Sequence, residues 1–352
     1  MNEFSTSQTP LAFVTGATGL LGNNLVRALL AQGFRVRALV RSPEKAKQQF
    51  NGLTIEIVTG DMLDVEAFAP ALVGVDVIFH TAAYFRDSYT GGRHWPKLHA
   101  ANVMGTRALL ERAYTAGVRR FVHASSIAVL RGPRGKVVDE TMLRDERHAD
   151  DYYRSKILAD QEVLGFLDRY SDFWAAMVLP GWMHGPGDMG PTSAGQTILD
   201  VARGKLPGVP PGSVSLVDAR DVAKAMIITH RQGRRGERYL AAGRHFTMKE
   251  LLPLIGEALS VEVPSRRLPL AMLYTVAMLS EIKACLTRKP VLFSWATARA
   301  LSTENERSHF SVAKSEAELG LIFRPVAETL CDEIAWFRTN GWLPDDERKG
   351  SR

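Results

Sequence analysis

Two side chains four residues apart have the types needed for acid–base chemistry. Tyr152 and Lys156 stand in a stretch that predicts a long helix over residues 152–170, where residues four apart share one face. A phenol has a reference pKa of about 10 and exchanges protons poorly at neutral pH, but a neighbouring ammonium favours the phenolate and lowers that pKa. The pair therefore predicts a tyrosine that passes a proton to or from a substrate.

Two serines follow a predicted strand upstream of this helix. Residues 120–124 (RFVHA) are typical of a buried strand, and Ser125 and Ser126 come directly after it. Ligands of open α/β sheets bind at the carboxyl ends of the strands. We therefore expect Ser126 to orient a substrate carbonyl beside Tyr152, with Ser125 as the alternative.

Three glycines between a predicted strand and a predicted helix form a second pattern. Gly16, Gly19 and Gly22 follow the apolar run 11–15 and open an apolar-periodic helix over residues 20–32. Glycines allow a tight turn and a close approach of the backbone to a diphosphate, and the helix N-terminus adds free N–H groups. The pattern predicts a dinucleotide site, with a purely structural turn as the alternative.

The end of the next predicted strand, residues 34–40, indicates which dinucleotide would bind. NAD sites carry an acidic residue about 20 residues after the glycines, but here Arg41 stands in that region and Lys45 lies one helical turn beyond it. Arginine pairs with a 2′-phosphate that a carboxylate would repel. We expect NADP, with NAD as the alternative cofactor and a plain surface role as the alternative for Arg41. Asp61 is expected to accept from the adenine amino group or to cap the next helix.

Strands and helices alternate along the first half of the chain. This alternation predicts right-handed βαβ units and a doubly wound parallel sheet of the Rossmann type. We expect a dinucleotide-binding domain over residues 10–180 and a smaller C-terminal α/β substrate domain over 181–345, with some of its strands and helices returning to the first domain. The predicted strands are 11–15, 34–40, 55–58, 76–80, 120–124 and 175–179, and the predicted helices are 20–32, 102–116 and 152–170.

Composition excludes several classes of protein. The net charge of +6 comes from scattered Lys and Arg without a nucleic-acid-binding motif, so nucleic acid is not an expected partner. Cys285 and Cys331 have no metal-ligand spacing and the nine histidines form no HxxxH motif, so no metal site is expected. Residues 1–10 are polar and lack the apolar core of a signal peptide, which favours a cytoplasmic protein.

One segment is unusually apolar. Residues 268–279 read LPLAMLYTVAML, which is too short for a bilayer span of about 20 residues. We expect a core helix or a lid over the active site rather than a transmembrane segment. The alternative is weak contact with a membrane surface or with an apolar substrate.

Eight motifs resemble the extended short-chain dehydrogenase/reductase family, and the resemblance runs from about residue 11 to residue 343. They are TGATGLLG (15–22), GDMLD (60–64), HTAA (80–83), NVMGT (102–106), HASSIAV (123–129), YYRSK (152–156), LPGWMHGPGD (179–188) and VDARDVA (217–223). The resemblance implies an NAD(P)-dependent enzyme with an Asn-Ser-Tyr-Lys tetrad on Asn102, Ser126, Tyr152 and Lys156. Asn102 would hold a water against the lysine. A homodimer formed through helices near Asn102 and Tyr152 is also implied.

The same resemblance extends the expected cofactor site beyond the glycine turn, to the backbone after the fourth strand and to the end of the sixth. The expected cofactor-binding residues are Gly16, Thr18, Gly19, Leu20, Leu21, Gly22, Arg41, Lys45, Asp61, Met62, Ala82, Ala83, Tyr152, Lys156 and Pro180.

The family contains nucleotide-sugar epimerases and dehydratases as well as reductases of the dihydroflavonol and 3β-hydroxysteroid type. The nucleotide-sugar enzymes usually carry an arginine just before the 217–223 motif, where this chain has Val214. Tyr84, Trp182 and Met183 are expected to line a mostly apolar pocket, with ordinary packing as the alternative.

We therefore expect hydride transfer between NADP(H) and a carbonyl or alcohol on a small, apolar substrate. A nucleotide-sugar epimerase or dehydratase with bound NAD(P) is the alternative, because the segments KSEAELG (314–320) and AWFRTNGW (335–342) resemble sugar epimerases.

Overall fold

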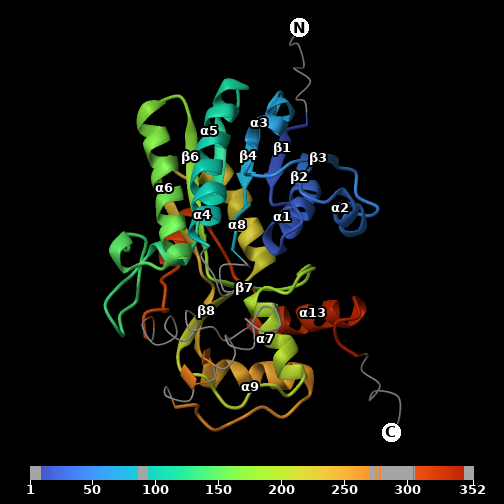
Figure 1. The fold of residues 1–352 in the computed structure, drawn as a ribbon, viewed down its shortest axis with the longest axis vertical. Helices are drawn as coiled ribbons and strands as arrows, with labels where there is room; N and C mark the ends of the chain where they lie inside the picture. The colour runs from blue at the N-terminus through green and yellow to red at the C-terminus, as the bar shows by residue number, and fades with distance from the viewer. Residues whose placement is uncertain are drawn as a thin grey trace.

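A seven-stranded parallel sheet forms the upper lobe of the molecule (Figure 1). The computed structural model describes residues 9–85, 94–269, 274–275, 277–278, 304 and 306–344. The six predicted strands are present with ends shifted by at most one residue, and a seventh joins from the C-terminal half. In sheet order the strands are β3 Glu56–Thr59, β2 Arg35–Val40, β1 Leu11–Thr15, β4 Val77–His80, β5 Arg120–Ala124, β6 Trp174–Pro180 and β9 Arg238–Ala241.

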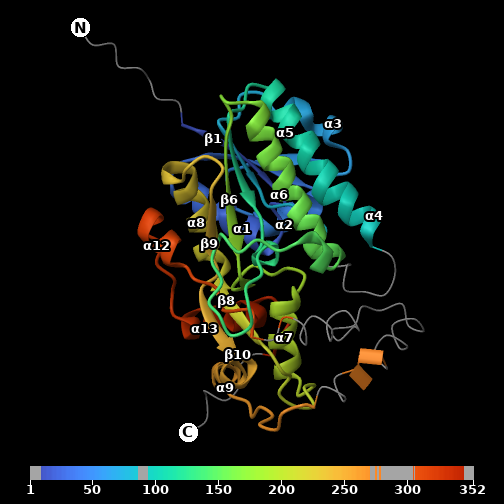
Figure 2. The same ribbon diagram turned by 90° about the vertical axis from the view of Figure 1, so that its left-hand side faces the viewer.

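Side-chain alternation gives this sheet two buried faces. On β1, Val14 packs in the apolar cluster of one face and Phe13 in the cluster of the other. Helices cover both faces, so central strands such as β1 and β4 are buried along their whole length, as in other parallel sheets. This arrangement confirms the doubly wound Rossmann fold. The helices on the Val14 face are α1 Leu20–Ala31 and α8 Ala219–Gln232, and those on the Phe13 face are α3 Val65–Phe68, α5 Gly105–Thr115 and α6 Asp151–Arg169 (Figures 1 and 2).

A smaller lobe lies below the carboxyl ends of the sheet strands (Figure 1). Its three strands are ordered β10-β8-β7, with β10 antiparallel and β7 parallel to the central β8. Its apolar core is formed by side chains of the helices of this lobe together with Leu216 of β8. The elements are β7 Trp182–His184, β8 Ser213–Asp218 and β10 Arg244–Thr247, with α7 Ser193–Ala202, α9 Met248–Leu259 and α13 Val326–Thr339.

The chain passes between the two lobes more than once. After β6 it enters the lower lobe at β7, and after β8 it returns to the upper lobe through α8 and β9. Helix α12, Ala313–Leu319, packs against α8 and β9, as Figure 2 shows. Three elements of the C-terminal half, α8, β9 and α12, thus pack in the upper lobe, and the division into domains over residues 10–180 and 181–345 stays a prediction.

A π-helical turn interrupts the helix that was predicted over residues 102–116. The observed helix begins earlier, as α4 Trp95–Leu98, continues as the π-helical turn His99–Met104, and ends as α5. Such turns insert one extra residue and occur often at functional sites. The short α2, Pro43–Gln49, completes the helices of the upper lobe.

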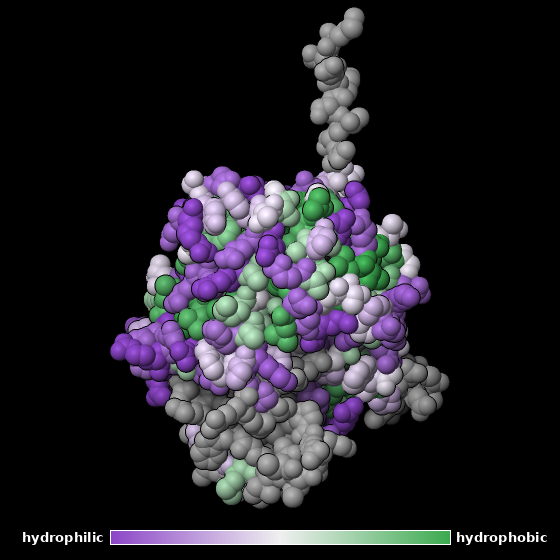
Figure 3. Space-filling view, turned by 45° about the horizontal axis from the view of Figure 1, so that its top comes forward, coloured by the Kyte–Doolittle hydropathy of each residue, from purple (hydrophilic) through white to green (hydrophobic). Residues whose placement is uncertain are grey.

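The described surface is mainly polar on the face that Figure 3 draws. On the face drawn in Figure 3, hydrophilic residues surround smaller hydrophobic areas. No helix within the described residues is long and apolar enough to cross a membrane. Most of the apolar segment 268–279 lies outside the described residues, so its expected role as core, lid or membrane contact stays a prediction.

Candidate active site

The glycine turn connects β1 to α1 and packs against the end of β4. Gly16 has φ +65°, and a Cβ there would lie 2.7 Å from the backbone of Ala82. A Cβ on Gly22 would lie 2.2 Å from the Gly16 carbonyl oxygen. Gly19 is the N-cap of α1 and offers no side-chain hydrogen bond, and the first turn of α1 has no acidic residue. The N–H groups of this turn therefore have no capping side chain, as in helix N-termini that bind anions. This cradle fits a dinucleotide diphosphate.

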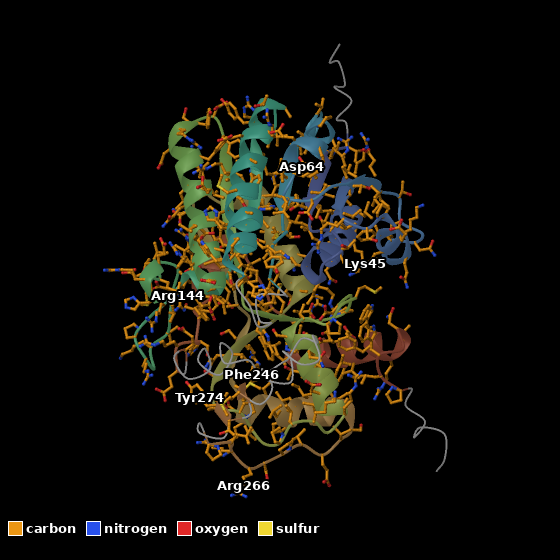
Figure 4. All side chains as sticks on the ribbon, in the orientation of Figure 1. Lys45, Asp64, Arg144, Phe246, Arg266 and Tyr274 are labelled. Carbon is orange, nitrogen blue, oxygen red and sulfur yellow. The ribbon has the colours of Figure 1, made fainter. Side chains whose placement is uncertain are left out.

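The residues after β2 present positive charge. Ser42 caps α2 by accepting from the Lys45 backbone N–H at 3.3 Å. Arg41 is exposed and has no hydrogen-bond or ion-pair partner within the part of the chain that the structure describes. Arg37, by contrast, pairs with Glu56 at 2.7 Å inside the sheet. Figure 4 shows Lys45 at the lower edge of the upper lobe, on the side of the smaller lobe.

Asp61 follows β3 but does not cap the next helix. Its Oδ1 accepts from the Leu63 backbone N–H at 3.0 Å, whereas Asp64 is the N-cap of α3. Of the two roles expected for Asp61, the cap is therefore wrong. Its contact with the adenine amino group stays a prediction, as does the contact of the neighbouring Met62.

Tyr152 and Lys156 lie on the first turns of α6, below the end of β5. The Tyr152 phenol lies near the Ser126 side chain, which acts to lower its pKa, and the Tyr152 ring meets the ring of Phe85 edge to face, 4.7 Å between centroids. The Lys156 ammonium donates to the Ala124 carbonyl oxygen at 3.0 Å. Ser126, rather than Ser125, is thus the serine that affects the pKa of the tyrosine, and its role toward substrate stays a prediction.

Burial shifts both ionisable groups toward their neutral forms. It raises the pKa of the Tyr152 phenol above its usual value, an effect that the nearby Ser126 side chain only partly offsets. It also lowers the pKa of the Lys156 ammonium from 10.5 to about 8, although the nearby Asp160 carboxylate opposes that shift. The lowered tyrosine pKa expected from the spacing alone is wrong, because desolvation together with Tyr153 and Asp150 raises the pKa, and Lys156 is not among the groups that shift it.

Asn102 lies in the π-helical turn and is 3% exposed, with its side chain fully engaged. Its Oδ1 accepts from the Tyr84 N–H at 2.7 Å, and its Nδ2 donates to the Tyr84 carbonyl at 3.1 Å and to Ser155 Oγ at 3.0 Å. Asn102 therefore fixes the segment after β4 against α6. Its role in holding a water beside Lys156 stays a prediction.

The residues after β6 divide between the two lobes. Pro180 ends β6 in the sheet, and Met183 packs against the cluster on the Val14 face of the upper lobe. Trp182 packs against the core of the lower lobe, where its Nε1 donates to Ser193 Oγ at 3.1 Å. The places of Trp182, Met183 and Tyr84 are compatible with a substrate pocket, and their contact with substrate stays a prediction.

The structure adds residues that sequence reasoning did not assign to the site. His80, Thr106 and Ser155 are buried and hydrogen-bonded around Asn102, and Phe85 covers the ring of Tyr152. Each stands inside or beside a motif, but spacing alone gives no signal that these side chains meet. Their contacts depend on how β4, the π-helical turn and α6 pack.

The fold and this geometry define a dinucleotide-binding enzyme with a tyrosine–lysine pair at the carboxyl edge of a Rossmann sheet. Residues 12–242 match the model of the NAD dependent epimerase/dehydratase family. The chain belongs to this family, within the extended short-chain dehydrogenases/reductases, and is an NAD(P)-dependent oxidoreductase of that class.

Relatives match over nearly the whole chain. Sterol demethylase protein B of Methylococcus capsulatus is 35% identical over 335 residues, 94% of this chain and 99% of that protein. A putative dihydroflavonol 4-reductase of Synechocystis is 30% identical over 342 residues, 94% of this chain and 95% of that protein. The crystal structure of gox2253 superposes with a TM-score of 0.80 at 35% identity, covering 95% of this chain and 100% of that one.

Proposed function

We propose that this protein is an NADP-dependent oxidoreductase that transfers hydride between NADP(H) and a carbonyl or alcohol carbon of a small, apolar substrate. The observation that carries the proposal is the position of the Tyr152 phenol beside Ser126, with the ring of Phe85 edge to face on the Tyr152 ring. This position supports a proton donor and a carbonyl-orienting hydroxyl that act together.

Tyr152 and Ser126 act on the carbonyl oxygen of the substrate, and Lys156 acts on Tyr152. When bound, the nicotinamide supplies a hydride to the carbonyl carbon. Tyr152 donates its proton to the carbonyl oxygen, which becomes the alcohol, and the raised pKa keeps the phenol protonated until then. Ser126 orients the oxygen. Lys156 stabilises the phenolate that remains and bonds the cofactor ribose.

Arg41 supports NADP over NAD. It is an exposed guanidinium with no partner among the described residues, at the place where NAD sites carry an acid. A guanidinium fits the 2′-phosphate as a bidentate partner. Lys45, on the first turn of α2, adds positive charge beside it.

Apolar residues support an apolar substrate. Val214 on β8 pairs with Phe246 on β10, and both pack on the core of the lower lobe, at the place where nucleotide-sugar enzymes carry an arginine (Figure 4). A phosphate held there would lose its charge-assisted partner. The names of sterol demethylase protein B and of the dihydroflavonol 4-reductase relative also point to apolar substrates.

A screen of carbonyl compounds with NADPH tests this function by nicotinamide absorbance. Apolar ketones and aldehydes should oxidise NADPH. Tyr152→Phe should reduce turnover to background while NADPH binding, measured by fluorescence, remains, because only the donated proton is removed. Tyr153→Phe, the neighbouring tyrosine without a lysine four residues on, is the matched control and should keep turnover. Retained turnover in Tyr152→Phe would contradict the proposal.

The second candidate is an epimerase or dehydratase that uses bound NAD(P) transiently, as the name of the family model suggests. It predicts copurified cofactor and conversion of nucleotide sugars without net cofactor consumption. The same screen, run with nucleotide sugars and followed by product analysis, distinguishes the two.

A further inference from the structure

A chain of buried hydrogen bonds runs from the glycine turn to the π-helical turn. The backbone N–H of Ala82 donates to Thr15 Oγ1 at 3.2 Å, and Thr15 Oγ1 lies 2.7 Å from His80 Nδ1. On the other side of the ring, His80 Nε2 lies 3.0 Å from Thr106 Oγ1, which donates to the Asn102 carbonyl at 2.7 Å. The side chains of Thr15, His80 and Thr106, which form this series of hydrogen bonds, are at most 1% exposed.

The partners fix the direction of every bond in this chain. A carbonyl oxygen only accepts, so the single proton of the Thr106 hydroxyl goes to Asn102. Thr106 must then accept from His80, which places the ring proton on Nε2. Burial and the nearby Lys156 lower the pKa of His80 to about 3, so the ring is neutral and Nδ1 carries no proton. Nδ1 therefore accepts from Thr15, whose oxygen accepts in turn from Ala82.

Beyond Thr106 the chain reaches the catalytic tyrosine. The Asn102 amide holds both backbone groups of Tyr84, the residue before Phe85. It also donates to Ser155 Oγ, which donates to the Tyr152 carbonyl oxygen at 2.7 Å. A shift of the π-helical turn would thus move both the aromatic cover of Tyr152 and the helix turn on which Tyr152 stands.

We infer that His80, fixed as its Nε2–H tautomer, is a positioning residue that ties the cofactor turn to the helix turn carrying Asn102 and thereby sets the place of Tyr152. The inference rests on the proposed role of Tyr152 as proton donor. His80 contacts neither substrate nor cofactor in this account. Both nitrogens of the buried His80 ring are hydrogen-bonded, so the ring has one arrangement. It therefore holds the glycine turn and the π-helical turn in a fixed relative position at little energetic cost.

Thr106→Val interrupts this series of hydrogen bonds with almost no change in the size of the side chain. It leaves His80 Nε2–H without its acceptor and removes the Thr106 hydroxyl from the Asn102 carbonyl oxygen. We expect kcat to fall roughly ten- to a hundredfold, as for a reacting group displaced by a fraction of an ångström to an ångström, while KM for NADPH stays nearly unchanged. Thr106→Ser keeps the hydroxyl and should restore kcat. Thr115→Val is the matched control, because Thr115 makes the same bond to the carbonyl four residues back on α5, but at the surface.

Nuclear magnetic resonance tests the inference without turnover. With ¹⁵N-labelled histidine, and with the His80 signal assigned by its loss in His80→Gln, the wild-type protein should show the Nε2–H tautomer. Thr106→Val should lose that tautomer preference and move the ¹³C-labelled Tyr152 ring signal, and Thr106→Ser should return both. The Thr115→Val spectra should match the wild type.

The results separate this inference from the proposed function. The positioning role would be overturned by a wild-type His80 that carries its proton on Nδ1. It would also be overturned if neither the Tyr152 signal nor kcat changed in Thr106→Val. Absence of NADPH turnover in the wild type with every substrate would overturn the proposed function, and the Tyr152 signal would still decide the positioning role.

Discussion

At Tyr152 and Lys156, burial acts on an acid and a base in one site. Both groups are pushed toward neutrality, which leaves the phenol protonated and the lysine with a pKa of about 8. The spacing of the two residues could be predicted from the sequence, because it needs only the period of a helix. The direction of the tyrosine shift could not, because it depends on Phe85 and the surrounding elements that remove water.

The lowered pKa of Lys156 predicts how cofactor binding depends on pH. The protonated ammonium binds the ribose and the anionic cofactor better, so NADPH affinity should be full below about pH 8 and fall as pH rises through that value. Titration of the dissociation constant from neutral to alkaline pH measures this. Lys156→Met should bind more weakly with no fall in that window. A parallel fall in both proteins would assign the effect to another group.

Arg41 predicts the choice of cofactor. Arg41→Ala should weaken NADPH binding roughly ten- to a hundredfold, the loss of a charge-assisted pair, and leave NADH binding nearly unchanged. Arg35→Ala, at the opposite end of β2 and paired with Glu56, is the control and should change neither affinity. If Arg41→Ala lost the same affinity for NADPH and for NADH, Arg41 would not recognise the 2′-phosphate.

At the scale of elements, the glycine turn and the start of α1 were predicted closely, because glycine spacing and an apolar period are local signals. The π-helical turn was missed. Residues 102–116 keep a helical pattern, and the extra residue shows only in how the turn meets β4 and α6. Asn102 was assigned to the tetrad through family resemblance, and its hydrogen bonds to Tyr84 and Ser155 could not be predicted from spacing.

Two helical glycines predict opposite effects of one substitution. In Gly22→Ala the new Cβ would lie 2.2 Å from the Gly16 carbonyl oxygen, so the turn must shift, with a loss of about 1–3 kcal/mol of stability and of NADPH binding. Gly165 of α6 has nothing within 4 Å of such a Cβ, so Gly165→Ala should stabilise by about 0.5–1 kcal/mol. Urea unfolding and NADPH titration measure both. A neutral Gly22→Ala would contradict the close-packed turn.

For the whole molecule, strand–helix alternation was sufficient to predict the doubly wound sheet, and the fold is confirmed. The placement of β9 beside β6 was not specified, because a short apolar strand such as Arg238–Ala241 has no local signal that names its neighbour. The same holds for the lower lobe. Its strands and helices are short, and the pairing of Val214 with Phe246 arises only when β8 and β10 meet.

In the proposed function the two lobes share one site, with the cofactor cradle and Tyr152 on the upper lobe and apolar residues on the lower lobe. The central claim is net hydride transfer to an apolar carbonyl compound, and deuterated NADPH measures it most directly. With an apolar ketone, the product alcohol should carry deuterium on its carbinol carbon, with one NADP⁺ formed per alcohol, and Tyr152→Phe should form neither. Unconsumed cofactor together with conversion of a nucleotide sugar would contradict the account.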